Sequence, residues 1–201
     1  KNIKGQIIND GGEEQYANSI ITYLSIVLGG RANYWSSFAA WSGSFIINTF
    51  GRQAIPMIWD FAEVNPFSNS TGCWSQGLKW MSLVLNNLKP KAKGVSKMND
   101  ASESIMNVNN PMVITDPPYY DNIAYADISD YFYIWHKKVL SDIYPDLFKT
   151  ILTPKEKEIT AFPHRFDNNK RDAEMHFLNG LSKAAKLIAN KHNENYPILY
   201  Y

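Results

Sequence analysis

Residues 113–120 read VITDPPYY, in which an acid, two prolines and two aromatic residues follow a short apolar run. The carboxylate of Asp116 and the backbone carbonyl of Pro117 could accept the two N–H groups of a planar aromatic amine. Such acceptors draw the amine nitrogen toward tetrahedral geometry, which exposes its lone pair for attack on a methyl donor. The prolines stiffen the backbone, so the acceptors are aimed before the substrate arrives. Tyr119 offers a flat face on which a base can stack.

The residues after Tyr119 are further candidates, each with a structural alternative. Tyr120 could stack on a substrate, or it could pack beneath the sheet. Asp121 and Asn122 could line a pocket, or they could hold the turn. A rigid proline turn with a structural tyrosine is the alternative for the motif as a whole.

The Asp-Pro-Pro-Tyr sequence resembles the catalytic motif of S-adenosylmethionine-dependent methyltransferases that act on amino groups. Aspartate at the first position is the adenine-type form, whereas serine is more usual in cytosine-N4 enzymes and asparagine in enzymes that methylate glutamine. The resemblance implies catalytic roles for Asp116, Pro117, Pro118 and Tyr119, substrate contacts by Tyr119, Tyr120, Asp121 and Asn122, and a contact of Asp116 with the cofactor S-adenosyl-L-methionine.

Longer blocks carry the resemblance over nearly the whole chain. They are similar, in the same order, to the prokaryotic DUF1156-type family of adenine-specific DNA methylases, and they comprise residues 48–74, 115–140, 147–159 and 196–201. The family resemblance implies a partial class I (Rossmann-like) sheet with several flanking helices. It also implies DNA as the partner and transfer of a methyl group to N6 of an adenine flipped out of the duplex.

One departure from the family concerns the cofactor. Family members are several times longer, and their glycine-rich cofactor loop lies upstream of the matched region. The segment of this chain that is most similar to such a loop is Ile26 to Gly30. It follows a helical pattern, so Gly29-Gly30 is better interpreted as the end of that helix. We therefore expect this chain to be an excerpt, with the cofactor loop on the remainder of the methyltransferase, and the isolated chain to be inactive.

The elements that must position the motif follow from apolar periodicity. Helices are predicted at 14–28, at 74–88 before Pro90, after the motif, and at 170–192. The helix after the motif presents Ile128, Tyr131, Phe132, Trp135 and Val139 on one face, with Asp127 or Ser129 as its N-cap. Met112–Thr115 is predicted as a short buried strand, and residues 198–201 are predicted as another apolar strand, parallel and adjacent to it. The motif then lies at the carboxyl end of a strand, where ligands bind in such sheets.

Between these elements lie a polar connection at 90–110 and a long ordered loop at 141–167, whereas residues 35–50 have no assignable type. We expect one domain over residues 1–201, with a helical and connecting part at 1–90 and an α/β part at 111–201.

Composition excludes few classes of function. The chain of 201 residues is 45% hydrophobic, which suits a folded core, and its net charge of +1 neither demands nor excludes a nucleic acid. A single cysteine, Cys73, rules out an internal disulfide, which favours a cytoplasmic setting. The four histidines have no ligand-like spacing, so no metal is assigned. No apolar run is long enough to span a membrane.

Two other functions remain open. The enzyme could methylate another amine, in cytosine, RNA or protein. Alternatively, the chain could be a catalytically silent DNA-binding or assembly module. The basic residues His164, Arg165, Lys170 and Arg171 could contact a DNA backbone, or they could form an ordinary solvated segment.

Overall fold

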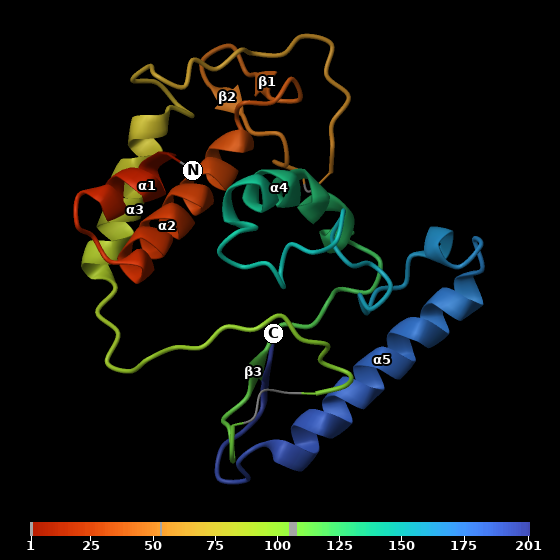
Figure 1. Ribbon diagram of the computed structural model, residues 1–201. Helices are drawn as coiled ribbons and strands as arrows, with labels where there is room; N and C mark the ends of the chain where they lie inside the picture. The colour runs from red at the N-terminus through yellow and green to blue at the C-terminus, as the bar shows by residue number, and fades with distance from the viewer. Residues whose placement is uncertain (1, 53, 105–107) are drawn as a thin grey trace. The chain divides into compact units, whose positions relative to one another are not determined.

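The computed structural model describes residues 2–52, 54–104 and 108–201 (Figure 1). These residues form five α-helices, one short 3₁₀ helix and two separate two-stranded sheets. The chain divides into two compact units. Unit 1 comprises Lys1–Lys93 and Asp127–Thr153, and unit 2 comprises Gly94–Ala126 and Pro154–Tyr201. That all 201 residues form a single domain stays a prediction.

Unit 1 is mainly helical, and its helix α2 packs against both α1 and α3. The bounds are α1 (Asn2–Asn9), α2 (Glu14–Ala32) and α3 (Trp74–Asn87). Gly77 on α3 lets α2 come close, because a Cβ at this position would lie 2.7 Å from Cγ1 of Val27. The predicted helix over residues 74–88 is confirmed to within one residue.

The interpretation of Gly29-Gly30 as a helix end is wrong, because α2 continues through both glycines to Ala32. A Cβ on Gly29 would lie 2.7 Å from Nε2 of His136, so this glycine makes room for a neighbouring ring. The carbonyl of Ala32, one of the last in α2, accepts a hydrogen bond from the Tyr131 hydroxyl at 2.8 Å. The chain therefore uses a long-range partner, rather than a glycine, at the end of this helix.

Helix α4 (Tyr125–Leu140) follows the motif, as predicted, but it begins earlier than expected. Asp127 and Ser129 lie inside the helix, so their assignment as N-caps is wrong. The Glu158 carboxylate accepts a hydrogen bond from the backbone N–H of Ala126 at 3.0 Å. A side chain distant in sequence thus satisfies a donor that a local cap usually satisfies.

Unit 2 has a coarse α/β character, with helices beside a small parallel sheet. Strand β3 (Ile114–Thr115) pairs in parallel with β4 (Leu199–Tyr200), with Ile114 opposite Leu199 and Thr115 opposite Tyr200. This confirms the predicted parallel pairing. Between the two strands lie η1 (Pro163–Arg165) and the long helix α5 (Lys170–Lys191), which confirms the helix predicted at 170–192.

The prediction that the strand at Met112–Thr115 is buried is wrong. Ile114 is 59% exposed and Tyr200 is 52% exposed. Over the described residues the parallel sheet has only two strands, so its faces lack the covering that larger parallel sheets receive. The described residues therefore show a two-stranded parallel sheet, and the Rossmann-like sheet stays a prediction.

The remaining described segments include a short hairpin and irregular connections. In the region that the sequence left untyped, β1 (Ala40–Trp41) pairs antiparallel with β2 (Ile46–Ile47). The connection at 90–110 is mostly exposed, apart from residues 105–107, which lie outside the described part of the chain. No helix among the described residues combines the length and the apolar character that a membrane span requires.

Candidate functional site

The candidate site is the segment Asp116 to Asn122, here named the DPPY turn, which begins directly after β3. It therefore lies at the carboxyl end of that strand, as the sequence predicted. Asp116 is exposed, so its carboxylate can meet a ligand. Pro117 and Pro118 are half-buried, which anchors the backbone between the acid and the aromatic residues.

Asp116 and Tyr119 contact each other directly. The Tyr119 hydroxyl donates a hydrogen bond to Oδ1 of Asp116 at 2.5 Å. This hydrogen bond, together with the nearby negative charge, raises the pKa of Tyr119 above its ordinary value. An ionised carboxylate offers about four lone-pair sites, so Asp116 can still accept a second donor. The contact therefore orients both side chains and leaves acceptor sites on the Asp116 carboxylate for a ligand.

Tyr120 is held against helix α5 and has an unusual backbone. Its φ of +59° lies in the left-handed region, which is uncommon for a residue with a bulky side chain. Its hydroxyl donates to Oε1 of Glu174 at 3.0 Å, and its ring packs edge-on against Phe177 with 5.3 Å between the ring centres. The bond to Glu174 raises the pKa of Tyr120. Of the two roles weighed for Tyr120, these contacts support packing.

Asp121 and Asn122 have exposed side chains. The backbone N–H of Asn122 donates to the carbonyl of Tyr119 at 3.1 Å, which closes a four-residue turn around Tyr120 and Asp121. The carbonyl of Tyr120 in turn accepts the N–H of Ala161 at 3.0 Å. Asn122 thus helps to hold the turn through its backbone, and both side chains stay accessible to a ligand.

Sequence reasoning missed the partners that hold this turn from a distance. Glu174 and Phe177 both follow the 3.6-residue repeat of the helix at 170–192, in which Glu174 is an acid among apolar residues. That position was the available signal that Glu174 has a specific partner. Ala161 carried no comparable signal, because its contact is made by the backbone N–H, which does not depend on the residue type.

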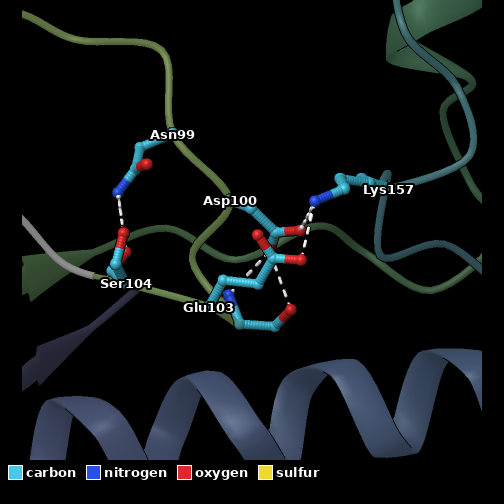
Figure 2. A network of polar contacts seen from close by, with 6 residues as sticks. Asn99, Asp100, Glu103, Ser104 and Lys157 are labelled. Carbon is cyan, nitrogen blue, oxygen red and sulfur yellow. Dashed lines mark hydrogen bonds and ion pairs between the residues drawn. The ribbon is translucent and has the colours of Figure 1, made fainter.

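A second polar cluster of unit 2 gathers around Lys157 (Figure 2). Its ammonium group lies 2.7 Å from Oε1 of Glu103 and 3.5 Å from Oδ2 of Asp100. Hydrogen bonds from Ser102, first of all, lower the pKa of Asp100. The bond to Glu103 is the main cause that raises the pKa of Lys157. These residues border a hollow of about 330 Å³ beside α5, whose lining also includes His176, Asn179 and Lys183.

The basic segment near η1 is only partly available to a partner. Arg165 forms an ion pair with Glu158 at 2.6 Å, and both side chains are 14% exposed. Its guanidinium carbon also lies 5.4 Å from the ring centre of Phe162. These contacts support a structural role for Arg165. His164, Lys170 and Arg171 are exposed, and their contact with a DNA backbone stays a prediction.

The described residues include no group of three or more His, Cys, Asp and Glu side chains that could hold a metal ion. For a cofactor, the exposed carboxylate of Asp116 is the charged group of the DPPY turn best placed to make a contact, because it stands directly at the strand end. Comparisons with models of protein families, with curated proteins and with solved structures find no match for this chain.

Proposed function

We propose that this chain is the catalytic portion of an adenine-N6 DNA methyltransferase that uses S-adenosyl-L-methionine. The observation that carries the proposal is the exposed Asp116 carboxylate at the end of β3, with the Tyr119 hydroxyl bound to it. An accessible acid and an aromatic ring fixed to each other on a diproline backbone suit recognition of a flat amine. The resemblance of the Asp-Pro-Pro-Tyr sequence to amino-group methyltransferases points to the same chemistry.

In the proposed reaction, the adenine is flipped out of the duplex, because its amine is unreachable within the stack. Asp116 and the carbonyl of Pro117 accept the two N–H groups of the amine, which turns the nitrogen lone pair outward. Tyr119 contributes its ring as a stacking surface. The cofactor, when bound, supplies an electrophilic methyl group on a sulfonium. The bond from nitrogen to the methyl group would form as the methyl–sulfur bond breaks and its electron pair stays on sulfur, which becomes a neutral thioether, and the nitrogen would lose one proton to Asp116 or to water.

The geometry of the DPPY turn supports this assignment in a second way. Catalysis of this kind depends on acceptors that are already oriented before the substrate binds. The proline rings restrict two backbone positions, and the Asp116–Tyr119 bond restricts two side chains. Little reorganisation is then needed when the base enters.

The proposal includes a further segment that carries the glycine-rich cofactor loop, either on the same polypeptide or on a partner chain. The small parallel sheet supports this. Two parallel strands with exposed Ile114 and Tyr200 resemble part of a larger sheet, because parallel strands are normally covered on both faces. Further strands beside β3 and β4 would complete a class I, Rossmann-like sheet.

The test is methylation by the natural polypeptide that contains residues 1–201, together with its cofactor segment. The protein is incubated with DNA and cofactor, and the nucleosides are analysed by mass spectrometry. We expect N6-methyladenine, its loss in Asp116→Ala with the fold unchanged by circular dichroism, and its retention in Glu194→Ala, which removes an exposed acid outside the site. Full activity of Asp116→Ala would refute the assignment.

The same experiment separates the alternatives. N4-methylcytosine, or label in RNA or protein, would identify another amine as the substrate. Binding of DNA without any transfer of label would identify a catalytically silent module. Each of these results would refute the proposed reaction and identify the alternative.

A further inference from the structure

We propose that Glu174 on α5 is a positioning residue that sets the shape of the DPPY turn through Tyr120, an inference that rests on the function proposed above. Glu174 does not belong to the motif, and it is distant from it in sequence. Its carboxylate accepts a hydrogen bond from the Tyr120 hydroxyl, and these contacts of Tyr120 support packing rather than contact with the base. Its role would therefore be indirect.

The first step of the argument concerns the backbone of Tyr120. A φ of +59° crowds the Cβ of an L-residue against the carbonyl group of the preceding residue, so an aromatic residue adopts it only when other contacts compensate. In the DPPY turn this conformation lets the chain reverse, and the N–H of Asn122 then reaches the carbonyl of Tyr119. The direction of Tyr119 therefore depends on Tyr120 keeping its left-handed conformation.

The second step concerns what holds Tyr120 in place. Three contacts act on it from outside the turn: the carboxylate of Glu174 at 3.0 Å, the Phe177 ring, which is perpendicular to the Tyr120 ring, and the N–H of Ala161 at 3.0 Å. Glu174 and Phe177 are three residues apart on α5, so they lie on one face of the helix. One face of α5 thus contacts both the hydroxyl and the ring of Tyr120.

The third step follows the contact to the acid. Tyr119 precedes Tyr120 directly, and its hydroxyl is bound to Asp116. A change in the backbone of Tyr120 therefore moves the Tyr119 hydroxyl relative to the carboxylate. Glu174 would act on Asp116 along this route, through two adjacent tyrosines. Loss of Glu174 should lower kcat while leaving DNA affinity almost unchanged, since the exposed contact groups remain.

The kinetic test compares Glu174→Ala, Glu174→Gln and Tyr120→Phe with a control, Glu194→Ala, an exposed acid that lies beyond the end of α5. We expect Glu174→Ala and Tyr120→Phe to lower kcat about 10- to 100-fold, as small misplacements of catalytic groups do. Glu174→Gln keeps a hydrogen-bond acceptor and should restore most of the rate. Wild-type rates in Glu174→Ala would overturn the proposal.

A second readout does not depend on methyl transfer. Tyrosines labelled with ¹³C at Cζ are observed by NMR, and the Tyr119 and Tyr120 signals are identified by their loss in Tyr119→Phe and Tyr120→Phe. We expect Glu174→Ala to shift both signals, and Glu194→Ala to shift neither. An unmoved Tyr119 signal in folded Glu174→Ala overturns the positioning role. Moved signals in a protein that transfers no methyl group instead reject the proposed function and leave the mechanical coupling standing.

Discussion

The hydroxyl of Tyr119 lies 2.5 Å from Oδ1 of Asp116, so the ring and the acid of the DPPY turn form one hydrogen-bonded pair. The two residues are separated by Pro117 and Pro118, which have little backbone freedom of their own. The pair therefore stands at the end of β3 with its geometry largely fixed. The following predictions test this geometry and the contacts that support it.

Replacement of Tyr119 should separate orientation from stacking. Tyr119→Phe keeps the ring but loses the bond to Asp116, so we expect kcat to fall about 10- to 100-fold at similar DNA affinity. Tyr119→Ala also removes the stacking surface and should weaken binding of a flipped base at least about tenfold further. Steady-state kinetics and binding of DNA containing 2-aminopurine measure the two effects. Tyr196→Phe, at an exposed tyrosine, is the control, and equal kinetics in all three variants would contradict the prediction.

Alkaline pH should weaken the folded state through the same hydrogen bonds. The pKa values of Tyr119 and Tyr120 are raised by their bonds to Asp116 and Glu174. Below the ordinary tyrosine pKa of about 10, both the folded and unfolded chains keep these protons, and the stabilisation is fully present. As pH rises through the raised pKa values, the unfolded chain loses protons first, so the free energy of unfolding falls. Urea denaturation between pH 8 and 11.5 measures how the free energy of unfolding falls with pH. This fall should be less steep in the double variant Tyr119→Phe/Tyr120→Phe, and an equally steep fall would contradict the prediction.

Glu158 should be important for stability. Its carboxylate pairs with Arg165 at 2.6 Å and accepts the N–H of Ala126 at the start of α4. Removing it leaves a mostly buried guanidinium and a helix donor without this partner, so Glu158→Ala should lower the free energy of unfolding by about 3 kcal/mol. Glu156→Ala removes an exposed acid nearby and should change stability by less than about 0.5 kcal/mol. Urea denaturation of both variants checks this, and equal effects would exclude the special role of Glu158.

The adjacent glycines of α2 should respond in opposite directions. A Cβ on Gly29 would clash with the His136 ring, whose Nδ1 lies 2.8 Å from the Ser25 hydroxyl oxygen, whereas a Cβ on Gly30 would meet open space. We expect Gly29→Ala to destabilise the fold by about 1–3 kcal/mol. Gly30→Ala should stabilise it by up to about 1 kcal/mol, because alanine favours a helix interior. Thermal denaturation distinguishes this result from the helix-end interpretation, in which neither substitution would stabilise.

The parts of the fold that are local in sequence could be predicted. Apolar periodicity located α3 and α5 closely, and β-branched residues before Asp116 located β3. The parallel pairing of β3 with β4 followed from the order strand, helix, strand. In each case the determining residues lie within the element or follow from chain order.

The features that were mispredicted depend on partners distant in sequence. Gly29 has the composition of a helix end, and only the position of His136 shows why a glycine is needed inside the helix. Similarly, Glu158 contacts the start of α4, so a local N-cap was not required. At the candidate site, the position of Asp116 at a strand end was predicted from the sequence. The hydrogen bond between Tyr120 and Glu174 could be found only from the structure.

The alternation of the two units along the chain has a consequence for synthesis and for protein engineering. The polypeptide passes between the units three times, after Lys93, after Ala126 and after Thr153. No single cleavage can therefore release either unit intact, and a truncation that removes the whole of one unit from either end also removes part of the other. On the ribosome, unit 1 can be completed only once Thr153 has emerged, when the segment bearing Asp116 has already left the exit tunnel.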